Sequence, residues 1–335
     1  MLNTLESVQT PPMTPGSRPK RSRLRIAPTV AAVGVLVVVG GASAYALFLN
    51  HTVTSNVKHQ ALLPAPSAGG PASPRLAEAK DSQNFLVIGS DSRSGSSRGL
   101  SDVIVLVHIN NDRSRVDLVH FPRDLYVSVP GHGKDKINAA YAFGGAPLLV
   151  QTVQNLVDTP IDHVSIIGFE GFKAMTNAVG GVDVFAEESS ASPTGNIVEG
   201  MNHLNGDQAL AFVRERHQLS EGDISRGKRQ QAFIKALMLK GLSKDVLLNP
   251  ISFGDAATKN LTVDNGFSMG TMRSEALQMR NLRGRDIYFT TAPFTGFGTS
   301  PIGGSIEKLD TKKFQQLSQS LQRDDMASYT ASNSK

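Results

Sequence analysis

The sequence predicts an α/β fold in which a central mixed β-sheet is flanked by helices. Short apolar runs that are typical of buried strands alternate with longer segments of helical periodicity. No break in composition separates these segments between residues 81 and 325. We therefore expect a single domain over residues 81–325, which includes a C-terminal extension.

The expected strands are apolar runs that end in glycine, proline or polar residues. The first is Phe85 to Ile88, and it delivers Asp91 and Arg93 at its carboxyl end, where open α/β sheets usually bind their ligands. The other expected strands lie at 101–110, 115–130, 162–169, 182–187, 211–217 and 286–293.

Helices are expected where apolar residues recur at helical spacing. The segment 136–158 has this period but is interrupted by Gly144 and Gly145. A second helix starts after Asp223, which stands where an N-cap would be, and ends at Gly241. Further helices are expected at 169–181 and 309–325, the latter followed by a disordered tail at 326–335.

The N-terminal part predicts a membrane anchor. Residues 1–26 are polar and end in a cluster of basic residues, as expected of a cytoplasmic disordered tail. Residues 27–49 contain no charge and are long enough, at about 1.5 Å per residue, to cross a hydrocarbon core of about 30 Å. Because the basic residues precede this segment, the positive-inside rule places the rest of the chain outside the cell.

A cleaved signal peptide is the alternative interpretation of the same apolar segment, and it also exports the chain. Residues 50–80 contain four prolines among alanine, serine and glycine, which predicts a semi-extended spacer. The sequence therefore predicts a single-pass protein of the cell membrane, with its cytoplasmic N-terminus linked to one extracellular domain.

The segment 209–231 carries the densest group of arginines in the expected domain. Arg214 and Arg216 would point to one face of a short strand, and Arg226 and Gln230 would lie on the first turns of the following helix. A helix N-terminus favours anions, and guanidinium groups bind phosphate through two hydrogen bonds. A phosphate or diphosphate is the expected ligand, and a solvated basic surface is the plainer alternative.

Two carboxylates and two further cations stand at the expected strand ends. Asp91 and Asp102 could hold Mg²⁺, or Mn²⁺, with coordination positions left for phosphate oxygens, while Arg123 and Lys136 would balance the remaining charge. Taken singly, each aspartate is as consistent with a turn or an N-cap residue.

Composition and motifs exclude several other classes. The chain of 335 residues has no cysteine, which rules out disulfides and thiolate nucleophiles. Neither an HExxH zinc motif, a phosphate-binding P-loop nor a GxSxG elbow is present. The net charge of +5 is divided between the N-terminal tail and scattered arginines, and aromatic residues make up only 6% of the chain, so a nucleic-acid partner is not indicated.

The order of short motifs resembles that of the LytR-CpsA-Psr (LCP) family. The matching segments are GSDSR, SD, PRD, KINAAYAFGG, GGVDV, LNGDQALAFVRER and DxxRxxRQ, which extend from about residue 84 to 242. The resemblance implies an LCP-like fold and an enzyme of the bacterial envelope. Such an enzyme transfers a glycopolymer of the teichoic acid, capsular polysaccharide or arabinogalactan type from a polyprenyl diphosphate carrier to peptidoglycan through a phosphodiester, with metal-dependent pyrophosphatase activity.

The resemblance also implies roles for individual residues. Asp91 and Asp102 would lie near Mg²⁺, and these two with Arg123 and Arg216 would form the catalytic group. The remaining residues expected around the diphosphate are Arg93, Arg98, Lys136, Arg214, Arg226 and Gln230. A plain diphosphate hydrolase and a non-catalytic sensory or attenuator protein remain alternative functions.

One position departs from the family pattern. Members commonly carry an arginine two residues before the second aspartate, where this chain has Leu100. We hypothesise that Arg98, in the flexible loop before it, supplies the missing charge.

Overall fold

The computed structural model describes residues 57–65, 74–90, 101–243 and 261–333. The predicted tail at 1–26 and the predicted membrane segment at 27–49 lie outside these residues. Within the described ranges no helix is both long and apolar enough to span a membrane.

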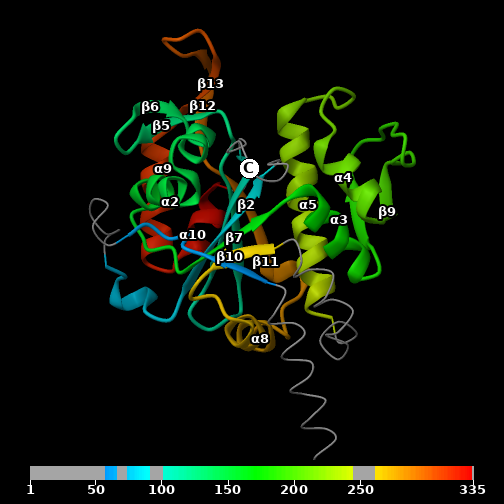
Figure 1. Ribbon diagram of the computed structural model, residues 1–335, viewed down its shortest axis with the longest axis horizontal. Coiled ribbons are helices and arrows are strands. Elements are labelled where there is room, and N and C mark those ends of the chain that lie inside the picture. The colour runs from blue at the N-terminus through cyan, green and yellow to red at the C-terminus, as the bar shows by residue number, and fades with distance from the viewer. Residues whose placement is uncertain (1–56, 66–73, 91–100, 244–260, 334–335) are drawn as a thin grey trace, which may run out of the picture. The chain divides into compact units, whose positions relative to one another are not determined.

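A seven-stranded mixed sheet forms the centre of the domain (Figure 1). Its strands run in the order β1-β10-β7-β2-β3-β4-β11. β2 pairs with β7 in parallel and with β3 in antiparallel orientation. The predicted mixed sheet is therefore confirmed. Its strands are β1 (Lys58–Gln60), β2 (Gln83–Ser90), β3 (Ser101–Ile109), β4 (Val116–His120), β7 (His163–Ile167), β10 (Leu261–Asp264) and β11 (Ile287–Thr291).

Two smaller sheets complete the strand pairing. A four-stranded sheet has the order β12-β13-β5-β6, and β8 pairs with β9 as a separate two-stranded ribbon. Their bounds are β5 (Leu125–Val129), β6 (Gly133–Lys136), β8 (Val182–Ala186), β9 (Gly200–Leu204), β12 (Phe294–Thr299) and β13 (Ser305–Leu309).

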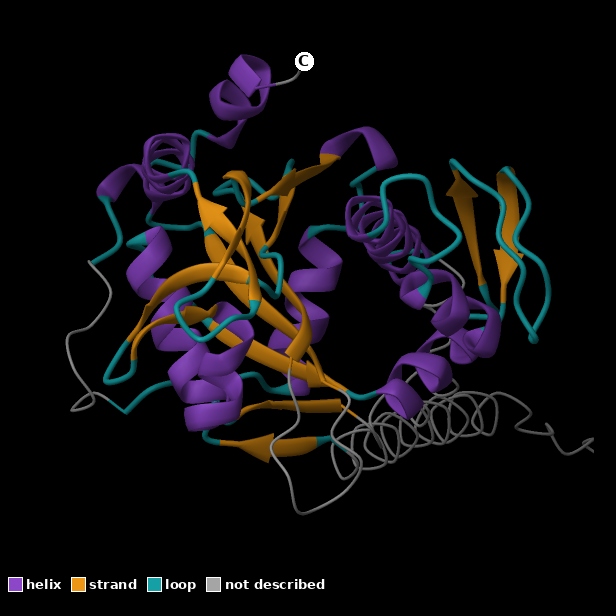
Figure 2. Cartoon of the chain, turned by 90° about the horizontal axis from the view of Figure 1, so that it is seen from above, coloured by secondary structure: helices purple, strands orange, loops and turns teal. Residues whose placement is uncertain are grey.

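Helices cover both sides of the central sheet (Figures 1 and 2). The α-helices are α2 (Ile137–Val157), α3 (Phe169–Ala178), α4 (Gly206–Arg214), α5 (Asp223–Gly241), α8 (Met269–Gln278), α9 (Thr311–Gln322) and α10 (Met326–Asn333). Two short 3-10 helices, η1 (Ala77–Ala79) and η2 (Gly284–Asp286), join other elements.

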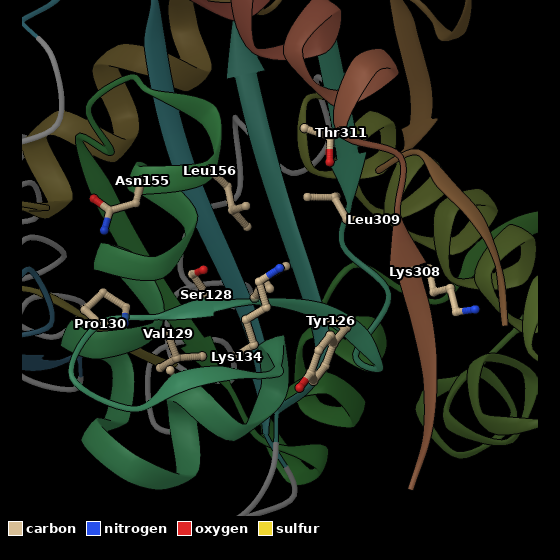
Figure 3. Close-up of a pocket in the computed structure, with 12 residues that line it drawn as sticks. Tyr126, Ser128, Val129, Pro130, Lys134, Asn155, Leu156, Lys308, Leu309 and Thr311 are labelled. Carbon is tan, nitrogen blue, oxygen red and sulfur yellow. The ribbon is translucent and has the colours of Figure 1, made fainter. Parts of the chain in front are cut away.

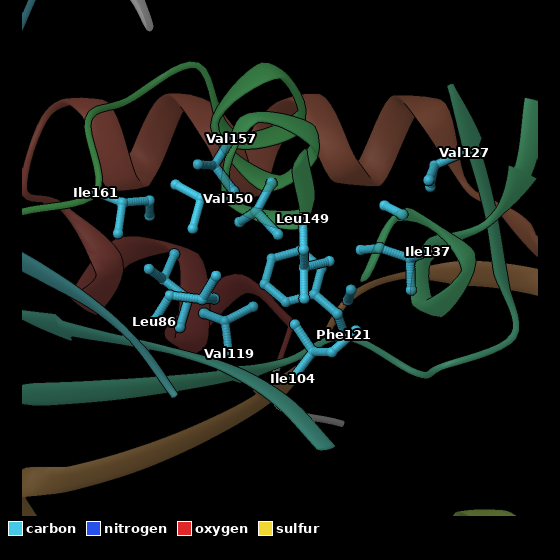
Figure 4. Close-up of a cluster of buried hydrophobic side chains, with 14 of the residues drawn as sticks. Leu86, Ile104, Val119, Phe121, Val127, Ile137, Leu149, Val150, Val157 and Ile161 are labelled. Carbon is cyan, nitrogen blue, oxygen red and sulfur yellow. The ribbon is translucent and has the colours of Figure 1, made fainter. Parts of the chain in front are cut away.

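The main hydrophobic core lies between the central sheet and helices α2, α9 and α10. Figure 4 shows Leu86, Ile104 and Val119 of the sheet facing the side chains of α2, among them Leu149 and Val157. All five side chains are fully buried. The apolar residues of α2 thus pack as ordinary core.

Helix α5 and the residues after α8 cover the opposite face of the sheet, where Met279 and Ile234 pack near Val116 and Leu118. A third cluster joins the β8–β9 ribbon to α3, α4 and α5 through Val182, Phe212 and Phe233. α5 therefore connects the ribbon with the central sheet, which fixes the position of its N-terminal turn.

The segment predicted as one strand at 115–130 forms two strands in different sheets. β4 ends at His120, and β5 begins at Leu125 after a turn through Pro122. Proline has no N–H to donate to a strand ladder, and the hydrogen bond from Leu125 N to Pro122 O, 3.0 Å, closes the turn. The turn carries Arg123 out of the sheet.

The prediction of a strand at 211–217 is wrong, because this segment belongs largely to α4. Asn205 and Gln208 form a reciprocal capping box at the start of the helix. Ala209, Phe212 and Val213 are buried along one helical face. The local strand propensity of Phe212 and Val213 is thus outweighed by the cap and by tertiary packing.

Two predicted boundaries also change. The proline-rich spacer was expected to continue to residue 80, but Lys58–Gln60 pairs in parallel with β10 as the edge strand of the sheet. Within the predicted disordered tail, Met326–Asn333 forms α10, whose Met326 and Tyr329 are buried in the main core. The helix was not predicted because most residues of this segment are small or polar, although Met326 and Tyr329 attach it to the core.

The predicted interruption of the helix at 136–158 is confirmed. Gly145 has a φ of 68° and a ψ of −159°, which breaks the regular course of α2. This backbone conformation is accessible to glycine with little strain. Pro147 then continues the chain into the second part of the helix.

Candidate anion-binding site

Strand pairing brings the candidate residues to one edge of the central sheet. Ser90, the last residue of β2, pairs with Ser101, the first residue of β3. β4 runs antiparallel to β3, with His120 opposite Val105. The end of β4 therefore lies beside the beginning of β3, which places Arg123 near Asp102.

The backbone around Arg123 is held on both sides. The N–H group of Phe121 donates to the carbonyl of Ile104 at 2.9 Å, and the Phe121 ring is fully buried. The N–H group of Asn138 donates to the carbonyl of Arg123 at 3.3 Å. Core burial and backbone pairing thus orient this turn before any ligand binds.

Two aspartates and two cations alternate along a chain of ion pairs. Arg123 Nη1 donates to Asp102 Oδ1 at 2.9 Å, and Arg123 Nε lies 3.5 Å from Asp124 Oδ2. Asp124 Oδ1 also pairs with Lys136 Nζ at 2.7 Å. The structure therefore brings three predicted site residues together through Asp124, which the sequence analysis did not single out. Its position directly after Arg123 in the PRD segment was the available signal.

The ion-pair cluster is accessible to a ligand. The side chain of Asp102 is 40% exposed, and those of Arg123 and Lys136 are each 29% exposed. Partly exposed guanidinium and ammonium groups at a fixed strand end can exchange a carboxylate partner for a phosphate oxygen.

The start of α5 reaches the same sheet edge. Burial of the His120 imidazole, reinforced by the positive charge of Arg226, lowers the pKa of His120 to about 4. Gly227 also faces the His120 ring, since a Cβ atom at this position would lie 3.8 Å from Cε1. Arg226 is thus close to the end of β4, as the diphosphate prediction requires. The helix starts at Asp223 itself, with Gly222 as its N-cap.

His120 is a residue that the sequence analysis missed. Its Nδ1 atom is buried without a hydrogen-bond partner in the described structure, although the residue as a whole is partly exposed. A buried unpaired polar atom is uncommon in a folded protein. The sequence signal was a histidine two positions before Pro122, at the end of an apolar strand.

Other polar residues of α5 have structural contacts. Arg229 is 5% exposed and donates to the Ser190 hydroxyl at 2.8 Å and to the Glu188 carbonyl at 2.6 Å. Gln230 is 8% exposed, and its Nε2 donates to the Val213 carbonyl at 3.3 Å. The amide of Gln230 joins α5 to α4, while its role toward a diphosphate stays a prediction.

Arg214 and Arg216 flank the end of α4 instead of sharing a strand face. The guanidinium of Arg214 lies over the Phe169 ring, 4.8 Å from its centroid. Between the two arginines, Glu215 accepts N–H groups of the turn that follows. Burial opposes ionisation of Glu215, but hydrogen bonds from the N–H groups of Gln218, His217 and Arg216 outweigh it and lower its pKa.

Three predicted site residues, Asp91, Arg93 and Arg98, lie outside the described residues. The strands on either side of them, β2 and β3, end and begin at the sheet edge that holds Asp102. Their predicted roles are untested by the geometry.

The side chains of the described residues could bind a hard cation such as Mg²⁺ only together with other ligands. Asp102 is a partly exposed carboxylate beside cationic groups, and within the described ranges no group of three or more His, Asp or Glu residues is arranged so that it could hold a metal ion. Mg²⁺ commonly uses one or two carboxylates and completes its shell with phosphate oxygens and water. Asp102 could supply one such carboxylate, while the predicted second one, Asp91, lies outside the described residues, so the metal site stays a prediction.

The structure is thus a mixed α/β protein that gathers arginine, lysine and aspartate at one edge of its central sheet, as is expected of a protein that binds phosphorylated ligands. The model of the LytR_cpsA_psr family matches residues 45–323. The chain therefore belongs to this family, which confirms the family predicted from its motifs.

Individual relatives agree with this assignment. The chain is 34% identical over 254 residues to the polyisoprenyl-teichoic acid–peptidoglycan teichoic acid transferase TagU of Bacillus mycoides, covering 73% of this chain and 82% of that protein. It is 29% identical to the cell wall biosynthesis protein LcpA of Corynebacterium glutamicum, covering 69% of this chain and 54% of that protein.

Solved structures show the same architecture. The crystal structure of B. subtilis TagV aligns with a TM-score of 0.66 and 26% identity, covering 73% of this chain and 98% of that one. The structure of TagT bound to LI-WTA aligns with a TM-score of 0.60 and 29% identity, covering 74% and 92% of the two chains.

Proposed function

We propose that the chain is a transferase that moves a cell-envelope glycopolymer from a polyprenyl diphosphate carrier to peptidoglycan through a phosphodiester bond. The observation that carries this proposal is the cluster of ion pairs linking Asp102, Arg123, Asp124 and Lys136 at the sheet edge. Family membership and the names of the teichoic acid transferases among the relatives support the reaction class.

The cations of the cluster suit the diphosphate of the carrier. Arg123 and Lys136 approach from the β4–β5 turn and the start of α2, and Arg226 approaches from the first turns of α5. Fixed positive groups that surround a diphosphate stabilise the charge that develops on the leaving phosphate. In phosphoryl transfer, a single well-placed arginine contributes on the order of 10³ to 10⁵ in rate.

The transfer step exchanges one phosphorus–oxygen bond for another. A hydroxyl of peptidoglycan attacks the phosphorus that carries the glycopolymer, and the bond from this phosphorus to the bridging oxygen breaks. Polyprenyl phosphate departs with the electron pair of that bond, and the hydroxyl proton passes to a carboxylate. Asp102 and Asp91 are the two candidate proton acceptors, and Arg123 would hold Asp102 in place.

A magnesium or manganese ion would supply additional neutralisation of the diphosphate charge when bound. Asp102 and Asp91 are the residues proposed to hold it. Arg123 and Lys136 would then bind phosphate oxygens that the ion leaves uncovered.

The same site supports a proposed pyrophosphatase activity, in which water replaces the hydroxyl acceptor. Whether the chain acts mainly as a hydrolase depends on access of peptidoglycan, since the charge stabilisation is common to both reactions.

We further propose that the catalytic domain lies outside the cell, behind one membrane helix at residues 27–49. The uncharged segment and its basic N-terminal flank support this orientation. A membrane anchor would keep the site near a carrier lipid.

The proposal is tested by incubating the purified full chain with carrier-linked glycopolymer, peptidoglycan and Mg²⁺. Covalently linked glycopolymer on peptidoglycan is the expected product, and Arg123→Ala should form it at least about 10²-fold more slowly. Release of free phosphorylated glycan without linkage to peptidoglycan would instead establish the hydrolase. If neither of these two products forms, the sensory alternative is supported.

A further inference from the structure

A groove lies between the β5–β6 hairpin, strand β13 and the carboxyl end of α2 (Figure 3). Its volume is about 630 Å³, which falls within the usual range of about 300 to 1,000 Å³ for ligand sites. Tyr126 and Lys134 come from the hairpin, Lys308 from β13, and Asn155 and Leu156 from α2. None of these residues belongs to the ion-pair cluster described above.

Strand register connects the groove to the candidate diphosphate site. Tyr126 is paired with Lys308 on one side and with Lys136 on the other, so these three side chains share one face of the small sheet. Ser128 and Lys134 form the next pair on that face, two residues further along each strand. The groove is therefore adjacent to Lys136, whose ammonium group pairs with Asp124.

The groove carries positive charge without a compensating carboxylate. Lys134 and Lys308 are both exposed, and neither forms an ion pair within the described part of the chain. Lys136 differs, since Asp124 already holds it. An exposed ammonium group at the wall of a groove attracts anions.

The two lysines occupy different parts of the groove. Figure 3 shows Lys134 in the middle, between Tyr126 and the residues at the start of α9. Lys308 lies at the rim, and Figure 3 shows its side chain directed away from Lys134 and Tyr126, toward Gly298 of β12. A Cβ atom at position 298 would lie only 2.4 Å from Lys308 Cε, so the glycine makes room for this cation.

The remaining lining mixes polar and apolar groups. Ser128, Asn155 and Thr311 provide hydroxyl and amide groups, whereas Pro130, Leu156 and the ring of Tyr126 provide apolar surface. Sugars present both hydroxyl groups and apolar C–H faces, which such a lining complements. A bare hydrocarbon chain would place apolar surface against an unpaired ammonium group, which is unfavourable.

We propose that this groove is a second binding site, for an anionic saccharide chain whose phosphate or carboxylate groups are bound by Lys134, with Lys308 at the rim. The inference rests on the proposed function, because both substrates of that reaction contain saccharides next to the reacting atoms. The anionic group comes either from a phosphate-containing glycopolymer or from the carboxylates of peptidoglycan. The site would guide one of these chains toward Lys136.

Measurements of direct binding distinguish the two possible sources of the anionic group. Isothermal titration calorimetry of the full chain would use a poly(glycerol phosphate) oligomer as one probe and a purified disaccharide muropeptide as the other. Lys134→Glu should weaken binding of one probe at least about tenfold, the size expected for loss of one charge-assisted hydrogen bond. Lys134→Arg, which keeps the charge, should restore most of it.

The matched control is Lys58→Glu, which makes the same charge change at an exposed lysine of the edge strand β1. This variant should bind both probes like the wild type. The proposal would be overturned if Lys134→Glu bound both probes as tightly as the wild type does. It would also be overturned if Lys58→Glu weakened binding as much as Lys134→Glu does. Circular dichroism and urea unfolding of each variant establish that it is folded.

The transfer assay distinguishes failure of this inference from failure of the proposed function. If the wild type transfers glycopolymer, Lys134→Glu should raise the KM for the bound substrate about tenfold, while the KM for the other substrate stays unchanged. Unchanged KM values in an active variant would refute the groove alone. Absence of transfer by the wild type would refute the proposed function, while the calorimetric result would still decide whether the groove binds saccharides.

Discussion

The guanidinium of Arg123 donates through Nη1 to Oδ1 of Asp102 across 2.9 Å, although the two residues are 21 positions apart. The contact joins the end of one strand to the beginning of its antiparallel neighbour. Both side chains are partly exposed, so solvent screens the pair and its contribution to folding is small. The main effect of this ion pair is therefore to hold two opposite charges at the candidate site.

Replacement of Arg123 by alanine should reduce kcat for transfer by at least about 10²-fold, because a donor to the developing phosphate charge is lost. The free energy of unfolding should change by less than about 1 kcal/mol, as for other exposed ion pairs. Steady-state kinetics and urea unfolding measure the two effects. Arg285→Ala, at a guanidinium that is 87% exposed on η2, is the control and should change neither. A large loss of stability in Arg123→Ala would assign the residue to folding instead.

The PRD segment, residues 122–124, shows which part of the candidate site could be predicted from the sequence and which could not. Arg123 and Lys136 were predicted to share a site, and the structure brings them together through Asp124. The bridging role of Asp124 requires knowledge that β5 and β6 belong to a sheet separate from β4. Local sequence does not contain this information, because it arises from pairing between distant strands.

Helix α4 illustrates the opposite outcome. The sequence suggested a strand from the apolar residues before Arg214, but Asn205 and Gln208 begin a helix several residues earlier. Recognition of this capping box would have predicted the helix from sequence alone. The placement of Arg214 against Phe169, in contrast, depends on the packing of α3 against α4.

His120 should make stability depend on pH. Its pKa is about 4 in the folded protein and 6.5 as the ordinary value, so between these values the unfolded chain binds a proton that the folded chain does not. Stability should therefore fall as the pH decreases from 6.5 to 4, by no more than about 3 to 4 kcal/mol, and this contribution should be constant above and below that window.

The test compares the wild type with His120→Asn by urea unfolding at pH 7 and at pH 4.5. The variant should lose less stability between the two values, whatever its stability at pH 7. His59→Asn, at an exposed histidine of β1, should retain the wild-type dependence. The same pH dependence in wild type and His120→Asn would show that another group is responsible.

The buried pair of His108 and Asp324 should be important for attachment of the C-terminal helices. His108 Nε2 lies 2.9 Å from Asp324 Oδ1, and the histidine side chain is fully buried. Nδ1 of the same ring lies 2.8 Å from Asn84 Oδ1. The three residues connect β2 and β3 with the segment between α9 and α10.

Replacement of Asp324 by asparagine should lower the free energy of unfolding by about 3 kcal/mol, because the buried His108 ring loses its negatively charged partner. The matched control is Asp183→Asn. Asp183 also pairs with a histidine, His203 at 2.8 Å, but its side chain is 62% exposed, so the cost should stay below about 1 kcal/mol. Urea unfolding measures both, and equal losses would contradict a special role for the buried pair.

Membrane topology offers an independent prediction. A reporter fused after Lys335 should be active only outside the cytoplasm, since one span with a basic N-terminal flank exports the carboxyl end. A reporter pair that is selective for the two compartments provides the measurement. Activity of the cytoplasmic reporter would overturn the proposed location of the domain.

The last prediction concerns Arg98, which lies in the segment between β2 and β3 and outside the described residues. Leu100 stands where the family pattern given by the resemblance has an arginine, and its apolar side chain cannot donate to a phosphate oxygen. The segment is rich in glycine and serine and is fixed at both ends by the pairing of Ser90 with Ser101. A long guanidinium side chain from position 98 is therefore proposed to serve the site in which Arg123 meets Asp102.

Arg98→Ala should reduce transfer by about 10²-fold, the usual effect of removing one donor to a developing oxyanion. Leu100→Arg on that background should restore part of the activity, because it returns a guanidinium to the position used by relatives. Kinetics at saturating carrier and Mg²⁺ separate the loss of a catalytic charge from weaker binding, since only the former lowers kcat. If Arg98→Ala retains full kcat under these conditions, the substitution hypothesis is wrong. The catalytic step then depends on fewer cations, and those already placed at the sheet edge, Arg123, Lys136 and Arg226, become the groups to examine.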